Sequence, residues 1–281
     1  LVKAVADLTE PKAAQLAAAT LKEWGMAKGQ TELLVSVILN PKAPKENLYG
    51  ALELFALNPT AKAIPGLMRI VEGDPELQPI VLNGLAAESL GKLGVAQATD
   101  ALIKCLWLDD PLGRNAVKEC RLALNRIGPT AVLPKVLETM ARKNTVVEKR
   151  ARKFKYNIGG AIEFKMAEML GDMPDPRAVD LLIDSMVKWE DMPAAVQANE
   201  NKAKAFISSR IQKVISSASA LAAIGDAKAV KPMLTLANSD DIALEFRLAG
   251  VQQLSFLGSE KAIPGLMKMM KAKHKMFLFY N

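Results

Sequence analysis

Apolar residues recur with the period of a helix in six stretches of the chain, at residues 61–68, 96–103, 130–137, 176–183, 227–234 and 260–267. Each stretch contains a small residue, here called the anchor, followed by mostly apolar residues one, four, five and eight positions later. This spacing places the apolar side chains in one stripe along a helix. The anchors are Ala63, Ala98, Val132, Ala178, Ala229 and Ala262. The chain therefore repeats one helical pattern, and such a repeat determines the architecture.

Helix-breaking residues predict a further helix before each of these stretches. Four glycines lie four residues before their anchors and a fifth lies seven residues before, each after a helical apolar pattern: Gly94, Gly128, Gly225, Gly258 and Gly171. A glycine there is typical of the left-handed residue that ends a helix. Pro65, Pro134 and Pro264 fall near the expected start of the second helix, where a missing N–H costs little. Each repeat is thus predicted to be a helix, a tight turn and a second helix.

The spacing of the anchors predicts how the chain is organised. Intervals of 35, 34 and 33 residues fit a two-helix repeat, whereas those of 46 and 51 contain insertions of about a dozen and about seventeen residues. We predict a divergent N-terminal repeat or cap at 1–42 and a repeat array at 43–272, with insertions near 143–160 and 190–212. Apolar spacing over 203–221 predicts an unusually long helix after the second insertion. Residues 273–281 are predicted to be a tail or the start of another helix.

Stacking is the way in which such repeats become stable. One helical pair cannot bury its apolar stripe alone, so neighbouring pairs must cover one another. The predicted fold is all-α, an α-α superhelix of about six to seven helical pairs whose second helices line the concave face. The abundance of Ala, Leu, Lys and Met agrees with a helical chain.

Composition narrows the possible chemistry. The single histidine, His274, removes most metal and acid–base chemistry that uses imidazole. No apolar run approaches the length of about 20 residues that a membrane span needs. The formal charge of +7 is modest and agrees with an anionic partner or with mere solubility. Because the chain begins at Leu1 without a signal-peptide pattern, we expect a fragment or processed product, and the compartment stays open.

Two segments carry the repeat pattern most fully. They are residues 217–237 (SASALAAIGDAKAVKPMLTLA) and 250–270 (GVQQLSFLGSEKAIPGLMKMM). The pattern resembles HEAT repeats, in particular the short bacterial variety named after phycobilisome lyases, and the resemblance covers about residues 43–272. It implies an armadillo-type α-solenoid. It implies little about function, since such repeats are a framework with interchangeable surfaces.

The resemblance raises two enzymatic alternatives, bilin attachment and DNA base excision. No stretch has a recognisable tetrapyrrole pocket signature. A HEAT-like DNA glycosylase needs aromatic and acidic residues in one cleft, whereas Trp24, Trp107 and Trp189 are scattered. Only Trp107 has acids close by in a repeat core, at Asp109 and Asp110, and we interpret it as the apolar end of a second helix beside its loop. We therefore expect no catalytic activity, no cofactor and no metal.

The densest cluster of charge is the basic stretch at 142–155. Val147, Ala151, Phe154 and Ile158 recur within it at helical spacing, which predicts a lengthened first helix of the inserted repeat. The cations then lie either on a merely solvated face or at a site for an anionic partner. The residues assigned to such a site are Lys149, Arg150, Arg152 and Lys153.

The exposed positions of the second helices provide a test for nucleic-acid binding. A phosphate track requires one position to be basic in repeat after repeat. At the position six residues after the anchor, the six repeats carry basic, acidic and uncharged residues. They are Arg69, Lys104, Glu138, Asp184, Thr235 and Lys268. This pattern weighs against a nucleic-acid track. We predict that these five charged residues contact a protein partner by mixed-charge complementarity.

Cys105 and Cys120 lie on consecutive predicted helices, at similar distances from the loop between them. Three interpretations stay open for them: two buried free thiols, a disulfide, or, with further ligands, a metal site. Taken together, the sequence predicts a non-catalytic scaffold that binds a protein partner in a larger assembly, through its concave face and its central insertions. A nucleic-acid-binding protein is the alternative, and a bilin lyase is a more distant one.

Overall fold

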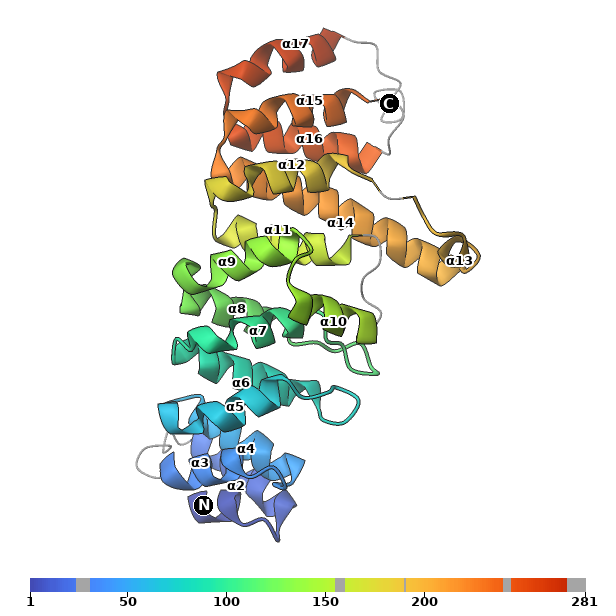
Figure 1. Ribbon diagram of the computed structural model, residues 1–281. Coiled ribbons are helices and arrows are strands. Elements are labelled where there is room, and N and C mark those ends of the chain that lie inside the picture. The colour runs from blue at the N-terminus through green and yellow to red at the C-terminus, as the bar shows by residue number, and fades with distance from the viewer. Residues whose placement is uncertain (24–30, 155–159, 190, 240–243, 272–281) are drawn as a thin grey trace. The chain divides into compact units, whose positions relative to one another are not determined.

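The computed structural model describes residues 1–23, 31–154, 160–189, 191–239 and 244–271 (Figure 1). This part of the chain is all α-helical and contains no β-strand, only one isolated bridge between Asp109 and Asn115. The predicted all-α helical-repeat fold is therefore confirmed. The chain divides into two compact units, Leu1–Lys135 and Val136–Asn281, with the boundary inside one helix.

The first unit is built from eight described helices and the start of a ninth. They are α1 Val2–Ala6, α2 Pro11–Glu23, α3 Thr31–Leu39, α4 Lys45–Phe55, α5 Ile64–Val71, α6 Ile80–Lys92, α7 Thr99–Cys105, α8 Val117–Ile127 and α9 Pro129–Met140. The first helices of successive pairs, α2, α4, α6 and α8, pack in series, and the second helices α3, α5 and α7 do the same. The pairs thus stack as the repeat predicts.

The second unit contains the remaining described helices. They are α10 Thr145–Phe154, α11 Ala161–Asp172, α12 Val179–Val187, α13 Ala194–Gln197, α14 Glu200–Ile224, α15 Val230–Asn238, α16 Leu244–Leu257 and α17 Ile263–Lys271. Here α11, α14 and α16 pack in series, as do α12, α15 and α17. With α2/α3, α4/α5, α6/α7 and α8/α9, the described residues form seven pairs, within the predicted number.

A short 3₁₀ turn precedes the second helix in five repeats, a detail that the sequence pattern did not predict. The turns are Ala61–Ala63, Ala96–Ala98, Pro176–Ala178, Ala227–Ala229 and Glu260–Ala262. Each turn ends at the anchor alanine, which is almost completely buried in every case. A small residue suits this position because its side chain lies in the closely packed core.

The predicted apolar stripes form the core. The residues four positions after the anchors are fully buried in five repeats: Leu67, Leu102, Val136, Leu182 and Met233. In the last repeat the stripe is open, since Ile263 is 55% exposed and Met270 is 80% exposed. Within the described part of the chain no later helix covers α17, so this stripe has no partner.

The predicted helix-ending glycines are mostly confirmed. Gly94, Gly128, Gly225 and Gly258 all have positive φ, between 62° and 93°. Gly171 was wrongly assigned, because it lies inside α11, which continues to Asp172. The placement of Pro134 was also wrong. It lies within α9 rather than at its start, because this helix begins at Pro129, directly after Gly128 and without a 3₁₀ turn.

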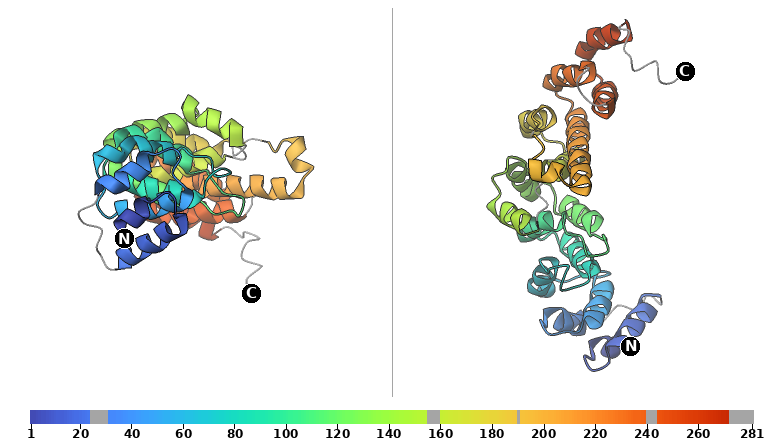
Figure 2. Two further views of the ribbon diagram at one scale, coloured as in Figure 1. Left: turned by 90° about the horizontal axis from the view of Figure 1, so that it is seen from below. Right: turned by 90° about the vertical axis from the view of Figure 1, so that its right-hand side faces the viewer.

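The long helix predicted after the second insertion is present as α14, with 25 residues. Its C-terminal half carries the expected buried stripe at Val214, Ala218 and Leu221. Its N-terminal half extends beyond α11, α12 and α16, with α13 packed at its outer end (Figure 2). Ile207 in this extension is 49% exposed. Its place in the apolar spacing of α14 therefore does not put it in the core.

Polar residues also hold neighbouring repeats together. Asn83 is fully buried on α6 and donates to the carbonyls of Ile70, Val71 and Gly73, which end α5, at 3.1–3.2 Å. Three other buried residues, each 15 or 16 positions before an anchor, likewise donate to carbonyl groups at the end of an earlier helix: Asn47, Lys213 and Arg247. Helix carbonyls that lack an intrahelical partner are thereby satisfied across the repeats.

Candidate functional site

The first insertion forms a separate helix, α10, and not the lengthened first helix that the sequence predicted. Val147 and Ala151 are buried as expected, but α10 ends at Phe154 and α11 begins after Gly160, which has a φ of 83°. Ile158 lies outside the described residues. The inserted helix α10 is thus not continuous with α11, and side-chain contacts link it to the neighbouring helices.

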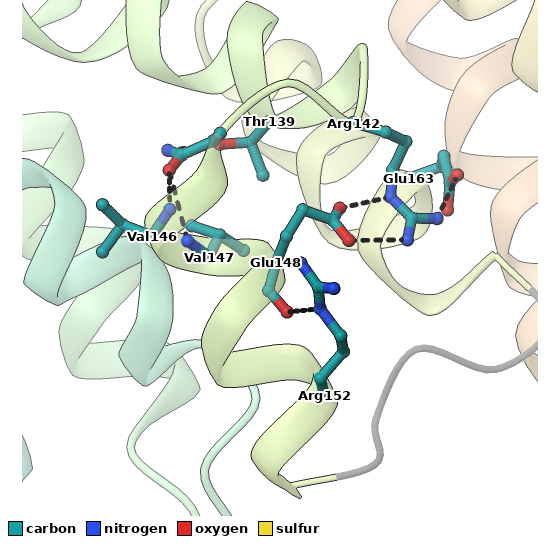
Figure 3. A network of polar contacts seen from close by, with 8 residues as sticks. Thr139, Arg142, Val146, Val147, Glu148, Arg152 and Glu163 are labelled. Atoms are coloured by element: carbon teal, nitrogen blue, oxygen red, sulfur yellow. Dashed lines mark hydrogen bonds and ion pairs between the residues drawn. The ribbon is translucent and has the colours of Figure 1, made fainter.

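Arg142 makes the main contacts that hold α10 in place (Figure 3). It lies in the turn between α9 and α10, and its guanidinium makes a two-bond contact with Glu148 on α10, Nε to Oε1 at 2.5 Å and Nη2 to Oε2 at 3.1 Å. Its Nη1 donates to Oε1 of Glu163 on α11 at 3.1 Å. One guanidinium therefore joins the inserted helix to the repeat.

The backbone of Arg142 forms the left-handed cap that ends α9, because its N–H donates to the carbonyl of Thr139 at 3.0 Å and the N–H of Lys143 donates to that of Glu138 at 2.9 Å. Its φ is 61°, in the left-handed region that a residue with a Cβ avoids. The hydrogen bonds that Arg142 donates to Glu148 raise the pKa of Arg142; burial opposes this rise and Glu163 adds to it. The guanidinium consequently remains charged, and the favourable contacts offset a strained backbone.

Glu163 occupies the repeat position that elsewhere supplies a donor. It lies 15 residues before the anchor Ala178, as Asn83 lies 15 before Ala98. In the repeat of Asn83 that position binds helix carbonyls, whereas here a carboxylate accepts from Arg142. In the repeat that carries the first insertion, this position therefore holds a hydrogen-bond acceptor in place of a donor.

The start of α10 is fixed by a second set of contacts. Asn144 is 2% exposed, and its Oδ1 accepts from the backbone N–H groups of Val146 and Val147 at 3.2 Å. Its Nδ2 donates to the hydroxyl of Thr139 on α9 at 3.0 Å. This cap satisfies the free N–H groups at the helix start and links them to the preceding helix (Figure 3).

The predicted basic residues of the insertion lie on α10. Lys149 and Arg152 are exposed, and Arg150 is half-buried. Arg152 makes one long hydrogen bond, from Nε to the carbonyl of Glu148 at 3.4 Å. Lys153 belongs to the helix, but its side chain lies outside the described part. The solvent face of α10 therefore carries positive charge on a firmly placed helix.

The second insertion is held by an aromatic contact. Trp189, directly after α12, stacks against the guanidinium of Arg210 on α14, whose carbon lies 4.3 Å from the ring centroid. The Trp189 ring lies 5.1 Å from that of Phe246 on α16, and its Nε1 donates to the carbonyl of Met186. Trp189 is thus a structural residue that fixes the loop leaving α12.

The predicted contact residues on the second helices have varied surroundings. Arg69 donates to the carbonyls of Ile38, Leu39 and Asn40 at the end of α3, at 2.7–3.3 Å, so this guanidinium already caps a helix.

Two of the other four residues of that set make ion pairs. Lys104 pairs with Glu72 at 2.5 Å. Asp184 pairs with Lys188 at 2.6 Å. Glu138 is half-buried, and Lys268 is exposed. The set is spread over both units, and its role in binding stays a prediction.

Cys105 and Cys120 are free thiols, and both are fully buried. Burial raises the pKa of Cys120, and a hydrogen bond with Cys105 adds to this effect, so the thiol stays protonated at neutral pH. Among the described residues no group of three or more potential ligands could hold a metal ion. Within the same residues no helix is both long enough and apolar enough to cross a membrane.

Comparison with known proteins identifies one repeat directly. The family model described as the PBS lyase HEAT-like repeat matches residues 84–106, from within α6 to the residue after α7. No curated protein matches the chain. The matched segment contains the pattern that the other repeats share, including the anchor Ala98. The matched segment is therefore a HEAT-like repeat, and similar helical pairs stack within each of the two units.

Proposed function

We propose that this HEAT-repeat protein is a non-catalytic scaffold that binds a protein partner, and that the solvent face of α10 is the main contact. The observation that supports the proposal is the attachment of α10. A loop insertion without a role needs no charged contact that joins two helices. A rigid surface binds with less loss of conformational entropy, so fixing α10 favours recognition.

The charge of α10 indicates the chemistry of the partner. Lys149 and Arg152 point to solvent on the same helix as Val146, an apolar residue that is 44% exposed. A partner surface with acidic residues around an apolar side chain would complement this face. The mixed-charge residues of the second helices are a further proposed contact, among which Lys104 and Asp184 would have to exchange their present ion pairs.

Site-specific photo-crosslinking tests the proposal. Benzoylphenylalanine in place of Val146, in cells that naturally make the protein, should crosslink one discrete protein partner. The same group in place of Lys62, which is exposed on the first unit, should not. The double variant Lys149→Glu/Arg152→Glu should remove the crosslink. A crosslink that survives the charge reversal, or the absence of any crosslink at 146, would contradict the proposed contact.

Nucleic-acid binding is the second candidate, because the same basic face also suits phosphate. Fluorescence anisotropy with duplex DNA at 50 and 300 mM salt separates the two functions. Micromolar binding that weakens steeply with salt and disappears in Lys149→Glu/Arg152→Glu would assign α10 to nucleic acid. Binding that is absent at both salt concentrations leaves the protein partner as the occupant.

A further inference from the structure

A groove on the first unit runs between the first helices α6 and α8. Its wider part has a volume of about 410 Å³, within the range of roughly 300–1,000 Å³ typical of binding pockets. Ile80, Val81 and Leu85 of α6 line one side of it, and Ala116 of α8 helps to line the other. Val81 is 46% exposed, so the apolar lining is open to solvent. All residues that line the groove belong to the first unit, whereas α10 belongs to the second.

The wall formed by the loop before α8 is preorganised. The carboxylate of Asp110, a buried residue, accepts from the backbone N–H groups of Leu112 and Arg114 at 2.9 Å and from Nε of Arg114 at 2.7 Å. The bridge between Asp109 and Asn115 closes the loop. Because Asp110 pairs with Arg114, the one cation of the wider part is already neutralised.

Two carboxylates mark the middle of the groove. Glu88 and Glu119 line both the wider part and a second depression of about 220 Å³ that continues along α8. Glu88 pairs with Lys92 at 2.7 Å. Carboxylates beside partly exposed aliphatic side chains favour a ligand that carries a positive charge next to apolar groups.

The far end of the groove has the opposite charge. The second depression is lined by Lys118, Leu122 and Arg126 as well as by the two glutamates. Leu122 is 44% exposed between the two cations. From one end to the other, the groove therefore presents an aliphatic, then an acidic, then a basic lining. At about 1.5 Å per residue, Val81 to Glu88 spans roughly 10 Å and Glu119 to Arg126 spans roughly 10 Å more.

We propose that this groove binds a helical segment of a partner protein that carries aliphatic side chains, then a lysine or arginine, then an aspartate or glutamate. The aliphatic side chains enter the wider part between α6 and α8. The basic side chain meets Glu88 and Glu119, and the acidic one meets Arg126 at the far end of the groove. This is recognition of an amphipathic helix by a groove, with the charges setting the register.

Two fluorescein-labelled peptides of identical composition test the order of charges. Both are alanine-based, 14 residues long and blocked at their ends, with three leucines on one helix face. In the first peptide an arginine and then a glutamate follow the leucines, and in the second these two residues are exchanged. In anisotropy titrations the first peptide should bind about tenfold more tightly, the effect expected of a matched rather than mismatched charge pair.

Variants of the full chain locate the binding. The variant Glu88→Gln/Glu119→Gln should reduce the difference between the two peptides to less than about twofold, because the charge readout is lost. Val81→Asp should weaken binding of the first peptide about tenfold, since it places a charge against the leucines. Glu76→Gln and Leu77→Ser, two exposed positions outside the groove, are matched controls and should change nothing. Circular dichroism confirms that each variant is folded.

Each alternative result has a definite meaning. Equal affinity for the two peptides, no binding of the first peptide at 1 mM protein, or binding that survives both groove variants would overturn the proposal. The variant Lys149→Glu/Arg152→Glu should bind the first peptide normally. A failure of the α10 contact is thereby distinguished from a failure of the groove.

Discussion

Removing the side chain of Arg142 should release α10 from the second unit. The guanidinium is 30% exposed, and the carboxylates that it binds on Glu148 and Glu163 are 17% and 15% exposed. A net gain of about 1.5–3 kcal/mol is typical of hydrogen bonds to charged groups. Arg142→Ala should therefore lower the unfolding free energy of the second unit by about 2–3 kcal/mol, since two half-buried carboxylates lose their partner.

A glycine at the same position separates the contact from the backbone strain. The left-handed conformation costs a residue with a Cβ about 1–2 kcal/mol, while glycine loses about 0.5–1 kcal/mol more through its freedom in the unfolded chain. Arg142→Gly should consequently be about 0.5–1 kcal/mol more stable than Arg142→Ala. Arg152→Ala, which loses one long hydrogen bond at an exposed position, is the control and should change stability by less than about 0.5 kcal/mol.

Hydrogen exchange measured by mass spectrometry, together with urea unfolding, provides the assay. A repeat array need not unfold in one step, so local protection is the more direct observable. In Arg142→Ala, peptides from α10 should exchange much faster, while peptides from α5 in the first unit keep their protection. Unchanged protection of α10, or Arg142→Gly no more stable than Arg142→Ala, would refute the role assigned to this residue.

Three further predictions concern the first unit. Asn83→Ala should lower the unfolding free energy by about 2–4 kcal/mol in urea titrations, because the carbonyls ending α5 lose their donor, whereas Asn201→Ala on the exposed part of α14 should have little effect. Burial tends to raise the pKa of Asp110, but the hydrogen bonds from Arg114 and Leu112 lower it overall. The charged form thus stabilises the fold at pH values above the ordinary carboxyl pKa of about 3.9, so Asp110→Asn should lower the melting temperature at pH 7. The difference in melting temperature between the variant and the original protein should disappear as the pH falls below about 4, and a difference that stays constant with pH would contradict this prediction. In the native protein at pH 8, Cys105 and Cys120 should react only slowly with a thiol reagent. In guanidinium without reductant, both should react at once, and the absence of any reaction there would reveal a disulfide.

The repeat architecture follows from the sequence because it depends on patterns that are local. Gly94 and Gly225 end helices at positions that only need a residue able to adopt positive φ. The stripe positions Leu67 and Leu182 are buried because helical spacing alone puts them on one face. These features required no knowledge of which segment packs against which.

The candidate site depends on tertiary contacts that local patterns do not encode. The spacing of Phe154 and Ile158 favours a continuing helix, whereas the paired glycines at 159–160 signal a break and would have predicted α10 as a separate element. The left-handed conformation of Arg142 belongs to the cap that ends α9, and no glycine marks this helix end in the sequence because an arginine stands there.

A polar residue in the buried face of a first helix is the signal that links these observations. At 15 or 16 residues before the anchor, Asn83, Lys213 and Arg247 supply donors to the ends of earlier helices, and a buried polar group there must have such a partner. A carboxylate at the same position cannot donate, so Glu163 requires a donor from elsewhere, and Arg142 provides it from the inserted turn. The reversal of sign at one repeat position therefore implies a cation brought in by the insertion. It explains in physical terms why the inserted turn supplies a guanidinium to Glu163, in addition to the cap at Asn144 that also links α10 to the repeat.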